Sequence, residues 1–292
     1  MAVKVILDTD IGTDIDDAIA LTYLLANPEC DLLGITTVTG EPEKRAMLAS
    51  SLCKLAGKEI PIYPGASDPL IIEQQQKLAE QANSLSKWEH ETKFPKGEAI
   101  EFLRRTIRQN PGEVILLPIG PLTNIGILFA LDPEIPSLLK SLVLMCGYFE
   151  QKIEGWNKLE WNAKGDYHAS HIVYRSQTPV HRSIGIDVTS QVTMSSDEFK
   201  KKFSAGIFRP LHDYARHWYH HYDRVTFHDP LAAAVIFNNE LCEFTRGDVT
   251  VELEEKDNRG LTHWIPSHSG KHEIATAVNK EKFFEEYFSV FK

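Results

Sequence analysis

Five aspartates fall within ten residues near the start of the chain, at Asp8, Asp10, Asp14, Asp16 and Asp17. Helix capping explains one or two of them, because a carboxylate at an N-cap or in a first turn complements the helix dipole. The others need a different explanation, since crowded carboxylates repel one another and raise one another's pKa. A hard divalent cation relieves that repulsion, because Ca²⁺ and Mg²⁺ both prefer oxygen ligands. The cluster therefore predicts a metal site, although its spacing is not that of an EF-hand loop.

Short runs rich in Val, Ile and Leu alternate along the chain with longer segments of helical periodicity. Such runs are typical of strands buried on both faces of a parallel sheet. Predicted strands are residues 3–7, 32–38, 60–63, 113–118, 141–146 and 180–186, and predicted helices include 16–26, 43–56 and 96–109. Alternating βα units predict an open α/β sheet with right-handed crossovers, which binds ligands outside the carboxyl ends of its strands. The aspartates follow the first predicted strand and so lie where a ligand is expected.

Composition limits the classes of partner. The chain has 292 residues, with 31 Lys and Arg against 41 Asp and Glu, so its formal net charge is −10. This charge argues against nucleic acid or an anionic membrane as a partner, because both would be repelled. No apolar run approaches the roughly 18–20 residues of a membrane span, and residues 3–7 are too short for a signal-peptide core. We therefore expect a cytoplasmic protein, and we interpret its four widely spaced cysteines as reduced core residues.

The aspartate-rich segment resembles the fingerprint of the inosine/uridine-type nucleoside N-ribohydrolase family, D-x-D-x-G-x-D-D-A. Here it reads Asp8-x-Asp10-x-Gly12 and then Asp16-Asp17-Ala18, with two extra residues between Gly12 and the aspartate pair. Four further parts of the chain resemble the family in the expected order: I-T-T-V-T-G at 35–40, L-P-I-G-P-L-T-N at 117–124, V-L-M-C-G at 143–147 with E-W-N at 160–162, and H-D-P at 228–230. Chance does not readily produce matches in the expected order over nearly the whole chain, so the chain is identified as a divergent member of this family.

The resemblance implies one domain over residues 1–292, built as a three-layer α/β fold. Its sheet is expected to be open and mostly parallel (mixed), with helices on both faces. The implied activity is Ca²⁺-dependent hydrolysis of the N-glycosidic bond of ribonucleosides to ribose and free base, with Mg²⁺ the less favoured ion. The implied ligands of the ion are Asp10, Asp17, Asp229 and the backbone carbonyl of Ile119. Because Ca²⁺ takes about 6–8 oxygens, positions would remain for water and sugar hydroxyls.

The resemblance also implies roles in catalysis. Asp10 matches the family's general base, which would take a proton from metal-activated water. Asp16 matches a residue that hydrogen-bonds a ribose hydroxyl. Cleavage of an N-glycosidic bond passes through an oxocarbenium-like state, which surrounding carboxylates would stabilise.

Other residues are expected to contact substrate. By resemblance these are Met145, Asn157, Glu160 and Asn162, although the E-W-N segment taken alone is equally explained as a polar loop. His228 precedes the expected ligand Asp229. A single histidine is more often structural, but imidazole titrates near neutral pH and could protonate a departing base. The resemblance implies that same role for His228.

An unusual aromatic and histidine-rich stretch covers residues 214–222. Tyr214, Trp218, His221 and Tyr222 share one face of a predicted helix. Packing or a wall around the base is the favoured interpretation. His217 and His221 have the i, i+4 spacing that could hold Zn²⁺, but no acidic or thiolate partner of suitable spacing is evident.

Three features depart from the family pattern. The loop after the third strand lacks the usual H-G-x-x-G-type segment and has glutamines at 74–76 instead. Glu41 stands where relatives usually have Asn, at a position expected near the water side of the metal. The insertion adds Asp14, to which the sequence assigns no role. These departures bear mainly on the choice of base.

Two other classes of function compete with the ribohydrolase. Strand-then-D-x-D also opens haloacid-dehalogenase-type phosphatases, in which Asp8 would be the nucleophile and Mg²⁺ would bind nearby; those enzymes usually have Thr or Val where this chain has Gly12. The second alternative is a related glycosyl hydrolase with a non-nucleoside substrate, or a non-catalytic riboside-binding homologue. The ribohydrolase remains favoured, with a role in purine or pyrimidine salvage. The resemblance suggests a homodimer or homotetramer.

Overall fold

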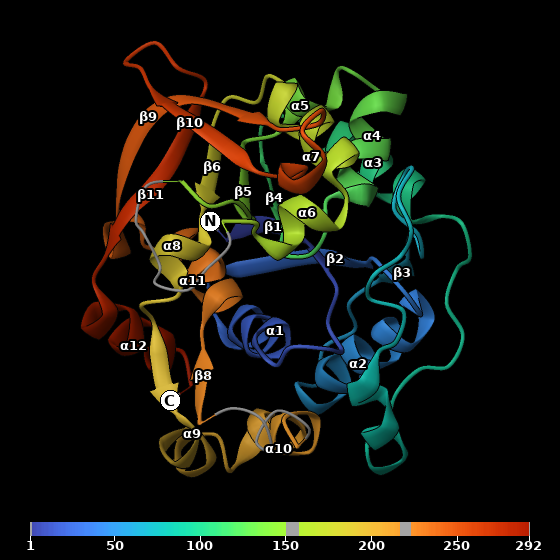
Figure 1. The fold of residues 1–292 in the computed structure, drawn as a ribbon. Helices are drawn as coiled ribbons and strands as arrows, with labels where there is room; N and C mark the ends of the chain where they lie inside the picture. The colour runs from blue at the N-terminus through green and yellow to red at the C-terminus, as the bar shows by residue number, and fades with distance from the viewer. Residues whose placement is uncertain (1, 150–157, 217–222, 292) are drawn as a thin grey trace.

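The computed structural model describes residues 2–149, 158–216 and 223–291, and it shows a large sheet between two layers of helices (Figure 1). In the described residues nine strands form this sheet, in the order β10 (Thr262–Pro266), β9 (Cys242–Val251), β11 (His272–Val278), β6 (His181–Ile184), β5 (Ser141–Met145), β4 (Val114–Pro118), β1 (Val3–Thr9), β2 (Cys30–Thr37) and β3 (Ile62–Pro64). Neighbouring strands from β11 to β3 are parallel, whereas β9 pairs antiparallel with both β10 and β11. The predicted three-layer α/β fold with an open, mostly parallel (mixed) sheet is confirmed.

The layers follow from the alternation of side chains along each buried strand. In β1, Val5 and Leu7 belong to one hydrophobic cluster, and Ile6 between them belongs to another. The first cluster includes side chains of α1 (Asp16–Ala26), α2 (Pro42–Leu55), α11 (His228–Val235) and α12 (Lys280–Ser289). The second includes side chains of α3 (Ala99–Gln109), α4 (Thr123–Leu131) and α7 (Tyr167–Arg175). Because successive strand residues point to opposite faces, one apolar run contributes side chains to both hydrophobic clusters.

Smaller elements complete the described chain. They are α5 (Ile135–Leu138), α6 (Trp161–Gly165), α8 (Ile186–Thr189), α9 (Ser196–Lys202), α10 (Arg209–Tyr214), the 3-10 helices η1 (Glu80–Lys87), η2 (Gly206–Phe208), η4 (Asn239–Leu241) and η5 (Lys256–Asn258), and a separate antiparallel pair, β7 (Thr193–Ser195) with β8 (Arg224–Thr226). None of the described helices has both the length and the apolar character that crossing a bilayer requires. All four cysteines are buried and unpaired.

The elements predicted from periodicity all have counterparts, with ends that differ by at most three residues. The largest difference is at α3, which begins at Ala99 because Gly97 has a φ of +70°, outside the right-handed helical region. Periodicity did not assign β9, β10 and β11, which extend the sheet beyond β6. What matters for the site is that β1 lies between β2 and β4, so the aspartate-rich segment emerges between neighbouring strands and not at a margin of the sheet.

A close contact between helices tests this packing. A Cβ at Gly126 in α4 would lie 2.7 Å from the Cβ of Ala169 in α7. We expect Gly126→Ala to lower the free energy of unfolding by at least about 1 kcal/mol, because the forced separation of the helices outweighs the gain in helix propensity. Urea denaturation measures the change. The control is Leu131→Ala at the end of α4, where the side chain is 63% exposed and an effect within about 0.5 kcal/mol is expected. Equal stability of Gly126→Ala and the wild type would contradict the close approach.

Candidate active site and metal centre

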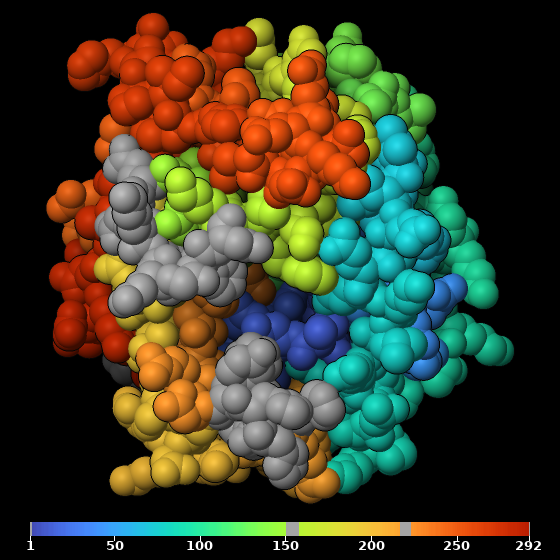
Figure 2. Space-filling view, in the orientation of Figure 1, coloured from blue at the N-terminus to red at the C-terminus, as the bar shows by residue number. Residues whose placement is uncertain are grey.

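A cavity of about 330 Å³ lies at the carboxyl ends of the central strands. In the space-filling view, N-terminal residues in blue form the bottom of a hollow between the yellow-green and cyan segments (Figure 2). Nine of the ten predicted site residues line this cavity: Asp10, Asp16, Asp17, Ile119, Met145, Glu160, Asn162, His228 and Asp229. The tenth, Asn157, lies outside the described residues. The fold thus brings together segments that are more than 200 residues apart in sequence.

Three carboxylates form a compact group in this cavity. Ligand oxygens of Asp16, Asp17 and Asp229 lie within 4.8 Å of one another, and all three residues are buried. Oxygens bound at 2.3–2.6 Å to one Ca²⁺ are at most about 5 Å apart, so this group could hold a metal ion. Asp16 and Asp17 stand in the first turn of α1 and Asp229 in the first turn of α11. The N-terminal dipoles of both helices therefore face the same negative charge.

The carboxylates are held by few hydrogen bonds. The Asp229 backbone N–H donates to Asp16 Oδ2 at 3.2 Å, and the Thr9 hydroxyl donates to the carboxylate of Asp17. Burial raises the pKa of Asp16, Asp17 and Asp229 well above the ordinary range, and repulsion by neighbouring carboxylates raises it further. An all-oxygen donor set with this much uncompensated charge suits a hard divalent cation.

Asp10 lines the same cavity from the loop after β1. Within the described chain, the group of carboxylates that approach to 4.8 Å does not include it, so its place among the ligands stays a prediction. Burial raises the pKa of Asp10, while the nearby guanidinium of Arg45 and a hydrogen bond from the side chain of Gln76 lower it. Asp10 is therefore a carboxylate with a cation behind it and an amide donor beside it.

Arg45 is a functional residue that the sequence did not reveal. It is fully buried in α2 beneath the aspartate-rich loop. Its Nε donates to the Gly40 carbonyl at 2.8 Å, and its Nη1 donates to the carbonyls of Asp10 and, at 3.2 Å, Ile11. Its Nη2 reaches the Leu78 carbonyl at 3.2 Å. A basic residue in a helical segment is ordinarily solvated, so only the tertiary structure shows this one to be a buried countercharge.

On the other side of the cavity, Asn162 is fixed by backbone carbonyls. Its Nδ2 donates to the Ile119 carbonyl at 2.8 Å and to the Met145 carbonyl at 2.9 Å. Because carbonyls only accept, Nδ2 must face these strand ends, and Oδ1 is the atom left for a ligand. The Ile119 carbonyl, predicted as a metal ligand, thus already accepts one hydrogen bond and keeps one lone pair.

Glu160 has a positioning role that the sequence did not indicate. It is the N-cap of α6, where its Oε1 accepts from the Asn162 N–H at 2.7 Å. Its Oε2 accepts from the N–H groups of Gly147 at 2.9 Å and Ala163 at 2.8 Å. Three backbone donors therefore engage this buried carboxylate, which ties α6 to the end of β5. Its contact with a ribose hydroxyl stays a prediction.

His228 is partly buried and faces the cavity at the start of α11. Its Nδ1 lies 2.7 Å from the Thr189 hydroxyl, which leaves Nε2 as the ring nitrogen available to a ligand. Burial lowers the pKa of His228 to about 4. The imidazole is therefore neutral at pH 7 in the substrate-free protein, where the sequence suggested titration near neutrality.

Several other expectations can now be placed. Glu41 does not face the cavity: its carboxylate binds Lys44 at 2.6 Å and the Ala79 N–H at 3.0 Å, so the expected position near metal-bound water is wrong. Asp14 does line the cavity. Tyr214 packs in the core with its hydroxyl on Ser51, which favours the packing interpretation. The proposed zinc pair, His217 and His221, falls outside the described residues together with Trp218 and Tyr222.

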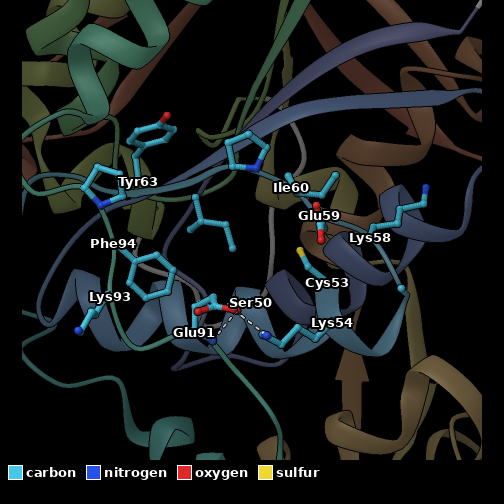
Figure 3. Close-up of a pocket in the computed structure, with 14 residues that line it drawn as sticks. Ser50, Cys53, Lys54, Lys58, Glu59, Ile60, Tyr63, Glu91, Lys93 and Phe94 are labelled. Atoms are coloured by element: carbon cyan, nitrogen blue, oxygen red, sulfur yellow. Dashed lines mark hydrogen bonds and ion pairs between the residues drawn. The ribbon is translucent and has the colours of Figure 1, made fainter.

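A second cavity, of about 720 Å³, lies between α2 and β3 (Figure 3). One of its two carboxylates, Glu91, is paired with Lys54 at 2.7 Å. None of the predicted site residues lines it. It is larger than the cavity at the aspartate cluster but is lined by none of that cluster's residues.

The raised pKa values predict a link between pH, metal and stability. A carboxyl whose pKa is higher in the folded than in the unfolded state stabilises the fold at low pH, and that contribution is lost as the pH rises through the folded pKa. Burial raises the pKa of Asp8 to about 7, and the pKa values of Asp16, Asp17 and Asp229 are raised in the same direction. In EDTA, we expect the free energy of unfolding to fall between pH 6.5 and 8, by up to about 1.4 kcal/mol per pH unit for each carboxyl whose folded pKa lies above this range and by less for Asp8, whose contribution is mostly lost by pH 7.

Urea denaturation at several pH values in EDTA and in excess Ca²⁺ measures this effect. The contribution of the histidines to the slope is the same in both solutions, because Ca²⁺ prefers oxygen ligands, so it cancels in the comparison. Calcium should flatten the slope, because a bound cation allows Asp16, Asp17 and Asp229 to ionise without repulsion. Parallel slopes with and without Ca²⁺ would mean that these carboxylates do not bind the ion.

Comparison with known proteins agrees with this geometry. A model of the family described as inosine-uridine preferring nucleoside hydrolase matches residues 5–285. The chain is 30% identical over 288 residues to uridine nucleosidase 1 of Arabidopsis thaliana, covering 91% of this chain and 84% of that protein. It is 28% identical to a pyrimidine-specific ribonucleoside hydrolase of Salmonella arizonae, covering 98% of this chain and 97% of the relative.

Solved structures show the same fold. A purine-preferring ribonucleoside hydrolase from Gardnerella vaginalis superposes with a TM-score of 0.84 at 25% identity, covering 98% of this chain and 97% of that one. A plant nucleoside hydrolase also gives 0.84, at 23% identity and with 99% of each chain covered. Because the family model spans nearly the whole chain and its characteristic residues converge on one cavity, this protein belongs to the inosine-uridine preferring nucleoside hydrolases and is an enzyme of that family.

Proposed function

We propose that the enzyme hydrolyses the N-glycosidic bond of ribonucleosides to ribose and free base in a Ca²⁺-dependent reaction. One observation carries the proposal: three separate segments of the chain, residues 10–17, 160–162 and 228–229, place a carboxylate cluster, an oriented amide and a histidine around one cavity. Its volume of about 330 Å³ is within the range of small-molecule sites. The proposed ligands of the ion are Asp10, Asp17, Asp229 and the Ile119 carbonyl, with Asp16 beside them.

Asp10 is the proposed general base. Burial strengthens it as a base, while Arg45 and Gln76 favour its ionised form. It would take one proton from a water whose oxygen bonds to the anomeric carbon as the bond from that carbon to the base nitrogen breaks. A bound Ca²⁺ would supply the charge that acidifies water and neutralises the cluster. The carboxylates around the sugar would stabilise its oxocarbenium-like transition state.

Substrate orientation is assigned to residues on both sides of the cavity. Asp16 and the free Oδ1 of Asn162 would accept hydrogen bonds from ribose hydroxyls. Glu160 would hold Asn162 in place through the N-cap of α6, and Met145 would contact the sugar. A site built on strand ends and helix termini keeps such groups in fixed relative positions.

His228 is proposed to assist departure of the base through Nε2. With a pKa of about 4, it acts in the substrate-free state as a neutral N–H donor. As the glycosidic bond breaks, negative charge develops on the departing nucleobase. That charge would draw the proton of His228 Nε2 toward a ring nitrogen of the nucleobase. Thr189 would keep the imidazole oriented by its contact with Nδ1.

The structure disfavours the phosphatase alternative. Its nucleophile would be Asp8, which is fully buried and does not line the cavity. Asp8 Oδ2 instead accepts from Thr36 at 2.5 Å and Asn124 at 2.7 Å, so it braces three parts of the sheet edge. The family match supports the hydrolase. Cytoplasmic location, a role in purine or pyrimidine salvage, and a homodimer or homotetramer stay part of the proposal.

A panel of nucleosides tests the function. Relatives are named for uridine, pyrimidine and purine substrates, so the panel should contain uridine, cytidine, inosine and guanosine, with and without Ca²⁺. We expect release of ribose and free base only when Ca²⁺ is present.

Asp10→Asn should lower kcat about 10²- to 10⁴-fold, because an amide cannot accept the proton. The exposed Asp31→Asn is the matched control. Turnover by Asp10→Asn near the wild-type rate would remove Asp10 from the base role.

The leaving-group role has its own test. We expect His228→Ala to slow hydrolysis of natural nucleosides by about 10²- to 10⁴-fold, the usual range for a general acid. The same variant should lose far less on p-nitrophenyl riboside, because nitrophenolate leaves without protonation. Damage to the metal site would slow both substrates alike, so equal losses would show that His228 is structural.

A further inference from the structure

Gln76 reaches into the active site from the loop that departs from the family pattern. Its Oε1 accepts a hydrogen bond from Trp161 Nε1 at 2.9 Å, and its Nε2 donates to the Thr13 hydroxyl at 2.7 Å. Gln76, Trp161 and Thr13 all line the same cavity as Asp10. In the space-filling view the cyan segment that carries Gln76 stands opposite the yellow-green segment that carries Trp161 (Figure 2).

The orientation of the Gln76 amide is determined by its partners. The indole N–H of Trp161 can only donate, so the atom facing it must be Oε1. Nε2 consequently faces Thr13 and the aspartate-rich loop. Since an amide nitrogen has two hydrogens, one remains after Thr13 is satisfied, and Gln76 lines the same cavity as Asp10. The Gln76 side chain also lowers the pKa of Asp10, as a donor directed at that carboxylate would. With its amide reversed, Gln76 would present an oxygen to that carboxylate and repel it.

Further contacts hold this arrangement in register. The Thr13 hydroxyl accepts from Arg45 Nη1 at 3.3 Å. Gln81 Nε2 donates to the carbonyls of Thr13 at 3.2 Å and Asp14 at 2.7 Å. The inserted residues between Gly12 and the aspartate pair are therefore bound to the glutamine-containing loop on several atoms. The two departures from the family pattern form one contact region.

We propose that Gln76 is a positioning residue that holds the Asp10 carboxylate through Nε2, and that Trp161 sets its orientation through the indole N–H. This inference rests on the proposed function, because holding Asp10 matters only if Asp10 acts on a water. Trp161 stands where the family's E-F-N segment has Phe, which has no donor. The tryptophan at this position and the glutamine at 76 thus act as a pair.

Kinetics of Gln76→Ala, Trp161→Phe and the double variant test the pair. Gln76→Ala should lower kcat about 10- to 100-fold, the effect of losing a hydrogen bond to a charged group. Trp161→Phe keeps the ring but removes the donor, and should lower kcat about 5- to 10-fold with KM changed less than about 3-fold. The double variant should match Gln76→Ala alone, because the indole acts only through Gln76. Gln75→Ala, at an exposed neighbouring glutamine, and Trp264→Phe in β10 are the matched controls.

Additive losses, or a change confined to KM in Trp161→Phe, would overturn the proposal and make Trp161 a wall of the pocket only.

A second readout needs no substrate. In protein labelled with ¹⁵N-tryptophan, the indole signal of Trp161 is the one that is missing from Trp161→Phe. In Gln76→Ala this signal should move toward the position of a solvated indole. In Gln75→Ala it should stay in place. An unmoved signal would overturn the hydrogen bond itself. An enzyme that cleaves no nucleoside but shows the shift would overturn the proposed function and support the placement of Gln76.

Discussion

Repulsion among the buried carboxylates of Asp10, Asp16, Asp17 and Asp229 must be offset before the elements that carry them can meet. The protein offsets part of it itself. The N-termini of α1 and α11 point toward the group, and Arg45 places a buried positive charge behind Asp10. These groups leave the pKa values of the carboxylates raised, so the site still favours a cation. Metal binding and folding stability are coupled for this reason.

Arg45 has a second effect, on the shape of the loop. A guanidinium has five N–H donors in a fixed plane, and this one is directed mainly at backbone carbonyls of the aspartate-rich loop and its neighbours. The loop is therefore held from beneath by a group that cannot lose its charge. The opposite wall is held by hydrogen bonds to the backbone, because the Asn162 amide binds two strand-end carbonyls and the Glu160 carboxylate binds three backbone N–H groups. The aspartates thus form one side of the cavity and an oriented amide forms part of the other.

Two of the departures from the family pattern lie in segments that contact each other. The insertion after Gly12 and the loop that contains Gln76 and Gln81 bind each other through side-chain amides and backbone carbonyls. Glu41 contributes to the same region by accepting from the Ala79 N–H, which explains why it turns away from the cavity. Loops of this kind tolerate change on the surface, but a change in one of two interacting loops must be matched in the other. Such a pair can reshape the entrance to the site without disturbing the carboxylate cluster.

The sequence by itself determined the α/β class, the order of the strands from β1 to β6 and nine residues of the cavity. It could do so because buried parallel strands are continuous apolar runs, and because the carboxyl ends of such strands meet at one edge. The tertiary structure alone decided which atoms face the cavity. From the sequence, Arg45 is only one residue of the predicted helix 43–56, Glu41 is expected near metal-bound water, and Gln76 belongs to a loop that lacks the family's usual segment. Side-chain direction depends on contacts between segments distant in sequence, such as Gln76 with Trp161, and no local periodicity encodes them. Burial likewise moved the pKa of His228 to about 4, a shift that depends on the surrounding fold and not on the residue type.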